Sequence, residues 1–412
     1  MRKKKSIIGL IAVAGLAAAK AAPLATGVSV FKTEAEGIVV SYNLSEDAIV
    51  TADFMTNGVS VGVVEVGGDV NKVVSSGERR ITWRPDRSPD HSRVMAADEV
   101  GVKLTVWPKT NPPDWMVVDL MVKNVLQFYA TSNDVPGGVG SRQYKTTKLL
   151  MRRIPAAGVE WRMGKENYNY GYDHYVKLSS DYYMCVYQLT LRQAYCINKT
   201  STSTFSDVVD DYWVLPLEGI SWRTMRGGAD WPADGHTVGD GCLIDGFRKW
   251  TGLELDLPTS AQWEFAARAG TSGEVWWGAD VSDAKVKGMA NCASAVGHPV
   301  EVGSYPPNPW GLYDMYGNII EECLDYCCFG SVYQGLYGNA PTVAVSDPEG
   351  PSSGECNVTV ATGERVRVGR GGGFSDATSS MRSHSVTGAN VHEYKESNRW
   401  IGYRLVCPLP WR

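Results

Sequence analysis

Short-spaced pairs of metal ligands are absent from this sequence. Its nine cysteines include no Cys-x-x-Cys pair, and its six histidines include no His-x-His or His-x-x-x-His pair. Zinc sites usually draw two ligands from one such short segment. The sequence therefore favours neither a zinc site nor a histidine-bound iron site, unless distant residues converge. The odd number of scattered cysteines also excludes the dense disulfide framework of a small secreted domain.

A hydrophobic run long enough to span a bilayer is missing as well. The apolar run 7–19 is too short to cross a membrane. It follows the basic residues 2–5 and precedes the small residues of Ala19-Lys-Ala21. This order predicts a secretory signal peptide over residues 1–22, with an uncleaved anchor as the alternative. No cysteine lies near the expected cut, so a lipid anchor is not indicated. We expect an exported protein, periplasmic, cell-surface or secreted, with no integral membrane segment after signal removal.

Positive charge is also in short supply. The formal net charge is -5, and removing the five basic residues of the leader moves it to -10. A protein that binds nucleic acid or an anionic membrane normally carries a basic surface. We therefore expect no nucleic acid partner, and a peptide, glycan or protein as the ligand.

Phenylalanine is scarce compared with the other aromatic residues. Eight Phe stand against fourteen Trp and twenty Tyr. Tryptophan and tyrosine carry a polar group on an apolar ring, so this bias indicates many half-buried or ligand-facing aromatics.

Residues 23–108 show the alternation of a small all-β domain. Val50, Ala52 and Phe54 alternate with polar neighbours, Asn57-Gly58 marks a tight hairpin, and residues 59, 61 and 63 continue the alternation on a return strand. Similar runs lie at 38–42, 80–83 and 102–106. Several short strands of this kind predict two packed sheets, as in a fibronectin- or immunoglobulin-like sandwich. Nothing in this part is typical of catalysis, so we expect a spacer or docking module, with carbohydrate binding as the alternative.

A second domain is expected over residues 155–412, after a linker at 109–154 that contains Pro112-Pro113 and a turn-rich stretch at 135–141. Thr190 with Gln193, and Thr259 with Gln262, fit the capping box that begins a helix. Apolar residues at helical spacing between 243 and 250 predict a third helix. Short strands surround these helices in the sequence, so the expected class is α+β with irregular connections.

The stretch 308–325 concentrates side-chain oxygens. Gly311 and Gly317 favour turns, while Asp314, Asn318 and Glu321 lie close together in sequence. Such a loop can offer several oxygens to a hard cation. The alternative is a buried turn whose Asp and Asn cap their own backbone.

Four motifs in a fixed order carry a family resemblance. They are Leu257–Gly270, Asn308–Asp325, Arg370-Gly-Gly-Gly-Phe374 and Trp400–Val406. Together they resemble the formylglycine-generating enzymes, or sulfatase-modifying factor domains, over about residues 155–408. The resemblance implies an irregular C-type-lectin-like fold with little regular secondary structure and a structural calcium ion. The ligands that it implies for calcium are Asp314, the carbonyls of Gly317 and Ile319, and Glu321. A second family calcium site begins at the position of Asn291, but the acidic loop that completes it is shortened here.

The sequence departs from the family at the residues that bind copper. Members of the family oxidise a cysteine with copper held by two thiolates, and these positions correspond to Asp376 and Met381. A carboxylate and a thioether do not replace the dithiolate that suits cuprous ion. Gly373 replaces the serine of the family motif, and Ile320 replaces a tryptophan. We therefore expect neither copper nor formylglycine synthesis.

The segment 375–399 suggests a different role. It is rich in Ser, Thr, Asn and His and poor in aliphatic residues, and loops of this composition suit recognition. It is similar in this respect to the variable proteins of diversity-generating retroelements, some of which use this fold. Our first hypothesis is a ligand-binding module, and the second is a metal- or oxygen-dependent oxidase with an altered site. Asp376, His384, His392 and Glu393 could also form an acid and base set, and the alternative is that they are polar loop residues on the surface. The candidate ligand-binding residues are Ser375, Asp376, Thr378, Ser380, Met381, His384, His392, Glu393 and Tyr394.

Overall fold

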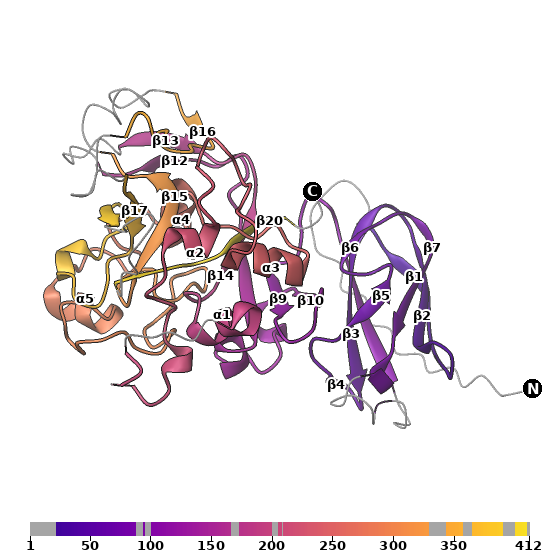
Figure 1. Ribbon diagram of the computed structural model, residues 1–412. Coiled ribbons are helices and arrows are strands. Elements are labelled where there is room, and N and C mark those ends of the chain that lie inside the picture. The colour runs from indigo at the N-terminus through magenta and orange to yellow at the C-terminus, as the bar shows by residue number, and fades with distance from the viewer. Residues whose placement is uncertain are drawn as a thin grey trace, which may run out of the picture. The chain divides into compact units, whose positions relative to one another are not determined.

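The computed structural model describes residues 22–87, 94, 100–165, 173–199, 205–207, 209–328, 343–356, 365–389 and 400–409. The chain divides into two compact units, with the division between Val139 and Gly140. Each unit is described by itself (Figure 1). The expected signal peptide, apart from its last residue, lies outside the described residues.

The first unit is built from strands. One sheet has the order β1-β2-β7-β5, and in the other sheet β3 pairs with β4, β6 and β8. Two further strands, β9 and β10, pair with each other in antiparallel fashion. The strands are β1 (Ala25–Thr33), β2 (Gly37–Leu44), β3 (Ala48–Thr56), β4 (Val59–Ser60), β5 (Val66–Gly68), β6 (Lys72–Val74), β7 (Gly77–Trp83), β8 (Val100–Trp107), β9 (Trp115–Asp119) and β10 (Leu126–Tyr129).

Both sheets of this unit contribute to one hydrophobic core. The predicted core residues of β3, Val50, Ala52 and Phe54, are buried together with residues of β2 and β7, although Ile49 and Thr51 between them are buried as well. The rings of Phe54 and Trp83 lie 4.7 Å apart. Two sheets that share one core form the sandwich architecture expected from the sequence.

The Asn57-Gly58 turn forms as predicted, but the return strand is shorter than predicted. Both turn residues have positive φ, at 51° and 76°, which the two-residue hairpin requires. Pairing then stops after Ser60. The N–H of Val61 still donates to the carbonyl of Phe54, at 2.9 Å, which is the next bond in the same register.

The segment 109–154, expected to be a linker, carries strands β9, β10 and β11 (Lys148–Ile154). All five residues of β9 are buried. An uninterrupted apolar run such as residues 115–118 can form a strand buried on both faces, which the alternation rule does not detect.

The second unit is an α+β domain with mostly short strands and long connections, which is the predicted class. Its strands are β11, β12 (Glu160–Met163), β13 (His174–Lys177), β14 (Tyr182–Cys185), β15 (Ile320–Tyr326), β16 (Val345–Ser346), β17 (Arg367–Arg370), β18 (Thr387–Ala389), β19 (Ile401–Gly402) and β20 (Val406–Pro408). Its helices are α1 (Leu191–Asn198), α2 (Trp222–Arg226), α3 (Leu243–Thr251), α4 (Ser260–Arg268) and α5 (Asp283–Met289). Strand β14 lies between β11 and β20, β13 between β12 and β16, and the last sheet has the order β18-β17-β15-β19.

Both predicted capping boxes begin helices. The hydroxyl of Thr259 accepts from the N–H of Gln262 at 3.2 Å, and the Gln262 amide oxygen accepts from the N–H of Thr259 at 2.9 Å. Thr190 and Gln193 do the same at the start of α1. Helix α3 also forms and stops at Gly252, whose φ of 72° is a left-handed cap.

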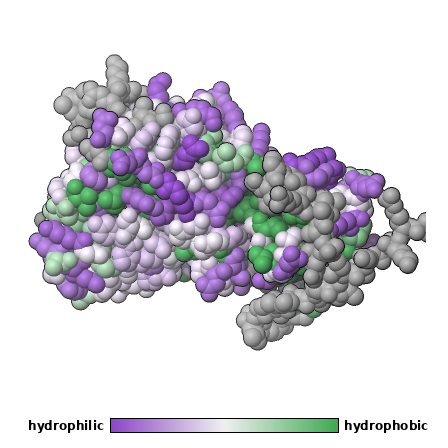
Figure 2. Space-filling model, turned by 90° about the horizontal axis from the view of Figure 1, so that it is seen from below, coloured by the Kyte–Doolittle hydropathy of each residue, from purple (hydrophilic) through white to green (hydrophobic). Residues whose placement is uncertain are grey.

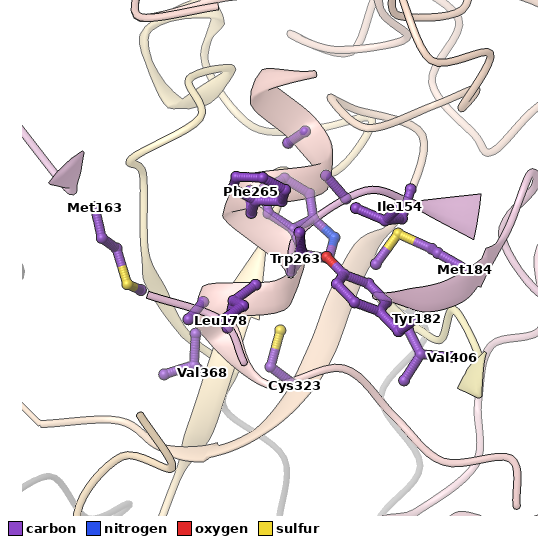
Figure 3. Packing of buried hydrophobic residues seen from close by; sticks show 14 of the residues in the cluster. Ile154, Met163, Leu178, Tyr182, Met184, Trp263, Phe265, Cys323, Val368 and Val406 are labelled. Carbon is purple, nitrogen blue, oxygen red and sulfur yellow. The ribbon is translucent and has the colours of Figure 1, made fainter. Parts of the chain in front are cut away.

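Helix α4 organises the main core of the second unit. The side chain of Trp263 is fully buried in a cluster that includes residues of β11, β14, β15 and β17. Figure 3 shows it between Ile154, Tyr182 and Met184 on one side and Cys323 and Val368 on the other. The Tyr182 hydroxyl donates to the carbonyl of Gln262 at 2.6 Å. The helix is therefore held from several strands at once, which fixes the positions of its polar residues.

Within the described residues, no helix combines the length and apolar character that a membrane crossing requires. Figure 2 shows separate green hydrophobic patches among white and purple residues on the face in view.

Candidate functional site

The position of the first family thiolate holds a carboxylate that is bound to its own turn. The Asp376 carboxylate accepts from the N–H of Gly373 at 2.9 Å, and the Asp376 N–H donates to the Gly373 carbonyl at 3.0 Å. The Asp376 carbonyl accepts from the N–H of Ala293 at 2.7 Å. Asp376 therefore closes a turn, because its side chain and its N–H both bond to Gly373, three residues before it.

Side chains fill the space around Met381, the position that corresponds to the second thiolate of the family. Met381 is fully buried in a cluster with Val286, Cys292 and Tyr316. Its methyl group lies only 2.3 Å from where a Cβ on Gly372 would be, and the Asp376 carboxylate lies 3.6 Å from the same point. The two positions therefore converge around Gly372, as a metal pair would need, but a thioether fills the space.

Among the other predicted ligand-binding residues, the structure places Ser375, Thr378 and Ser380 in one region and His384 in another. Ser375 is exposed, and Thr378 and Ser380 are half-buried on the adjoining turn. The Thr378 hydroxyl donates to Asp283 of α5. His384 is buried and lines a separate cleft. His392, Glu393 and Tyr394 lie outside the described residues.

Three of the four groups predicted to hold calcium converge on one atom, and the Asp314 carboxylate, which binds the Gly303 N–H, is the exception. The side-chain nitrogen of Gln188 lies 3.4 Å from the Gly317 carbonyl, 3.1 Å from the Ile319 carbonyl and 3.1 Å from a Glu321 carboxylate oxygen. The backbone carbonyl of Asp314 is 3.4 Å from the same nitrogen. An amide group has two hydrogens and cannot satisfy four oxygens. The loop thus surrounds one point with more acceptors than the amide can satisfy.

The charges around this point are only partly balanced. Arg404 binds both carboxylate oxygens of Glu321, at 2.6 and 2.9 Å, and the Trp263 indole donates to one of them at 2.7 Å. Asp314 accepts from the Gly303 N–H at 2.6 Å, and burial raises its pKa to about 6. A buried carboxylate with a raised pKa gains from a nearby cation.

This donor set fits calcium. Calcium accepts carboxylate and carbonyl oxygens in mixed shells, at distances of about 2.3–2.6 Å. Because the Gln188 amide lies where the oxygens converge, it would have to turn aside to admit the ion. In the described part of the chain, no three His, Cys, Asp or Glu side chains cluster as ligands for a metal.

A cleft of about 580 Å³ opens beside α4. Its aromatic wall consists of Trp161, Phe265 and Trp310, with ring centroids 5.5 Å apart for the first pair and 5.4 Å apart for the second. Pockets of about 300–1,000 Å³ with aromatic walls and a few fixed polar groups are typical of ligand sites. The charged and polar side chains that line it are Arg162, Lys165, Arg268, Glu274 and His384.

Buried ion pairs hold the walls of the cleft in place. Glu264 of α4 binds Arg268 at 2.6 Å and Arg370 at 3.0 Å, and it accepts from the Gly164 N–H at 2.9 Å. Arg268 also donates to the carbonyls of Gly164 and Gly273. Burial alone would raise the pKa of Glu264, but the two arginines lower it below its usual value. Strand β12, helix α4 and the loop after α4 are therefore fastened to one another.

His384 is neutral at physiological pH. Its pKa is lowered to about 4, chiefly by burial, while Glu264 and Glu274 act in the opposite direction and Arg268 and Lys165 in the same direction. A neutral imidazole carries one donor nitrogen and one acceptor nitrogen.

Replacing His384 by asparagine is expected to change the pH dependence of stability. The folded protein keeps this imidazole neutral down to about pH 4, whereas the unfolded chain takes up a proton below about pH 6.5, so His384 costs stability as the pH falls between these values. After allowance for solvent screening, we expect the free energy of unfolding of the wild type relative to H384N to fall by about 2 kcal/mol between about pH 7 and about pH 4. Urea titrations across this range measure the difference, and parallel pH profiles would contradict it.

Most residues of the cleft were not identified from the sequence as candidate site residues. Trp161 comes from β12, Phe265 from α4, Trp310 from the oxygen-rich loop and Glu274 from the loop after α4. Only the excess of tryptophan over phenylalanine pointed toward ligand-facing aromatics. Their convergence is a property of the tertiary structure.

The fold and these sites define an irregular α+β domain with an oxygen-rich loop and a central helix anchored by buried arginines. Residues 142–409 match the sulfatase-modifying factor enzyme 1-like domain, which is well over half of the chain. The chain belongs to this family, which confirms the prediction from the four motifs.

The chain is similar to several curated relatives. It is 29% identical over 210 residues to the formylglycine-generating enzyme of Streptomyces coelicolor, covering 47% of this chain and 60% of the enzyme. It is 36% identical over 110 residues to serine/threonine-protein kinase pkn1 of Chlamydia pneumoniae, covering 26% of this chain and 16% of the kinase. It is 31% identical over 125 residues to the inactive C-alpha-formylglycine-generating enzyme 2 of Bos taurus, covering 26% and 40%. The chain spans less than two thirds of the length of each.

Two solved structures resemble the chain over most of their own length. Treponema denticola variable protein 1 has a TM-score of 0.46 and 23% identity, covering 66% of this chain and 97% of that protein. PvdO from Pseudomonas aeruginosa has a TM-score of 0.44 and 19% identity, covering 63% and 94%.

Proposed function

We propose that this protein is an exported, ligand-binding member of the family that does not make formylglycine. The observation that carries the proposal is the state of the two metal positions, where Met381 is fully buried and Asp376 closes a turn with Gly373. Neither side chain is a thiol, and a thioether fills the space between them. One relative, from Bos taurus, is itself named an inactive member of the family.

Export is part of this proposal. The basic, apolar and small residues of positions 1–22 follow the order of a secretory signal. The mature protein would then act in the periplasm, at the cell surface or outside the cell.

The ligand is a peptide, glycan or protein, recognised through the face around residues 375–399. Ser375 is exposed at the start of this segment, and Thr378 and Ser380 are half-buried beside it. A rigid turn that presents small polar side chains suits recognition. If the chain is diversified by a retroelement, this segment is the place where we expect its variants to differ.

Calcium is the cofactor in this proposal, with a structural role. Asp314, the carbonyls of Gly317 and Ile319, and Glu321 would hold it, and the surplus of oxygens around the Gln188 amide supports this assignment. The ion would brace the loop that follows α5 against the strand that carries Glu321.

Copper binding and oxygen uptake with a cysteine-containing sulfatase-type peptide test the proposal. We expect the wild type to bind no cuprous ion and to consume no oxygen above the peptide blank. The rival hypothesis, an oxidase with an altered metal site, predicts oxygen uptake by the wild type.

The D376C/M381C double variant is the positive control for metal binding. Because both side chains approach Gly372, two cysteines there are expected to bind cuprous ion as a dithiolate, and each single variant is expected to bind it far more weakly. Competition with a chromogenic cuprous chelator measures the difference. Oxygen uptake by the wild type would remove the proposed function.

A further inference from the structure

We propose that the cleft beside α4 binds an uncharged glycan, with the apolar face of a sugar ring lying against Trp161, Phe265 and Trp310. This inference rests on the proposed binding function and names its ligand class. It concerns a site apart from the two former metal positions, with His384 as the residue that the segment 375–399 contributes to it.

The aromatic wall supplies the apolar contact. Phe265 is 7% exposed and touches both tryptophans, which are only partly buried. Both tryptophans line the cleft, and the ring of Phe265 packs against each of them. A half-buried tryptophan gains most when a flat apolar surface covers its ring, and the C–H face of a pyranose is such a surface.

The charges that line the cleft are already paired. Arg162 binds Asp173 through two bonds, of 2.6 and 2.7 Å. Lys165 pairs with Glu274, which also binds Arg382 at 3.1 Å. A charged ligand would have to compete with one of these partners for its counterion.

A hydroxyl group suits paired charges better than a carboxylate or an ammonium does. It donates one hydrogen bond and accepts others, so it can bind at Arg162–Asp173 or Lys165–Glu274 without breaking the pair. His384 also lines the cleft, and its imidazole is neutral. A purely apolar peptide side chain would leave these groups unused. Aromatic contact surrounded by paired donors and acceptors therefore points to a polyhydroxylated ligand.

The cleft is also held ready for binding. Arg268 donates to the carbonyls of Gly164 and Gly273, which belong to two different segments of the lining, and Glu264 anchors Arg268 at 2.6 Å. Walls that are fixed before binding lose little conformational entropy when the ligand enters.

Binding of the full chain to soluble polysaccharides tests this inference. The probes are mannan, laminarin and starch as uncharged glycans, heparin as a charged one, and a tryptophan- and tyrosine-rich peptide. Affinity electrophoresis and tryptophan fluorescence measure binding. We expect at least one uncharged glycan to bind and to change the fluorescence, with heparin and the peptide weaker.

Two sets of variants locate the binding. Trp310→Ala is expected to weaken glycan binding by about tenfold or more, whereas Trp213→Ala, at a half-buried tryptophan outside the cleft, is expected to leave it unchanged. Val159→Glu adds an unpaired charge at an exposed lining position and is expected to weaken binding similarly. Val343→Glu is its matched control, because Val343 is 76% exposed and does not line the cleft.

The outcomes separate this inference from the proposed function. Binding of the peptide or heparin but of no uncharged glycan would overturn the inference and leave the protein a binding module. Glycan binding that survives both Trp310→Ala and Val159→Glu would also overturn it. Absence of binding to every uncharged probe by the folded wild type would count against the ligand class, while oxygen uptake with a cysteine peptide would count against the proposed function.

Discussion

Replacing Glu264 by glutamine (E264Q) is expected to lower the free energy of unfolding by about 3–5 kcal/mol. The Glu264 carboxylate is fully buried and faces two guanidinium groups, those of Arg268 and Arg370. Glutamine keeps the shape but removes the negative charge that lies between them, which leaves two buried cations with a neutral amide. Breaking a buried ionic group in this way exposes an uncompensated charge to a low dielectric.

The matched control is an exposed ion pair of the same unit. Asp240 binds Lys249, and their side chains are 93% and 62% exposed. Asp240→Asn is expected to change the free energy of unfolding by less than about 1 kcal/mol. Urea titrations of the three proteins measure both effects. A loss below about 1 kcal/mol for E264Q would mean that the buried network does not hold α4 in the way described.

Calcium binding is expected to have the second large effect on the free energy of unfolding. Adding the ion to chelator-treated protein should raise the free energy of unfolding by about 4 kcal/mol when its concentration exceeds the dissociation constant a thousandfold. For a domain of this size, the midpoint of thermal unfolding should rise by about 10 °C. The physical reason is that the ion binds the convergent oxygens of the folded loop and has no such site in the unfolded chain.

Variants at two buried aspartates distinguish a loss of calcium binding from a general loss of stability. Asp314→Asn is expected to abolish the calcium-dependent increase. Asp325 is also buried and has a pKa of about 6, raised chiefly by burial, but it accepts from the Ser260 N–H and does not take part in the oxygen cluster. Asp325→Asn should therefore keep the full calcium response, whatever its own stability. A wild type that does not respond to calcium would refute the assignment.

Local sequence signals predicted the local structure well. The Asn57-Gly58 turn needs two positive φ angles, which these residue types adopt easily, and it forms. The threonine and glutamine of each capping box bond within four residues of each other, so no tertiary information is needed.

Features that depend on distant contacts were not predictable in the same way. The cleft joins residues near 161, 265, 310 and 384, which only the packing of α4 against the strands brings together. Gln188 lies well over a hundred residues before the loop that surrounds its amide. The pairing of β3 with β4 ends at Ser60. Alternation alone does not predict where a strand ends, because pairing also depends on the neighbouring strands.

The central claim is that this framework recognises a ligand and has lost the oxidase chemistry of its family. The most direct measurement is the mass of a sulfatase-type cysteine peptide after incubation with the purified chain, cuprous ion, a reductant and oxygen. We predict an unchanged peptide mass. The loss of mass that accompanies replacement of the thiol by an aldehyde would contradict the claim.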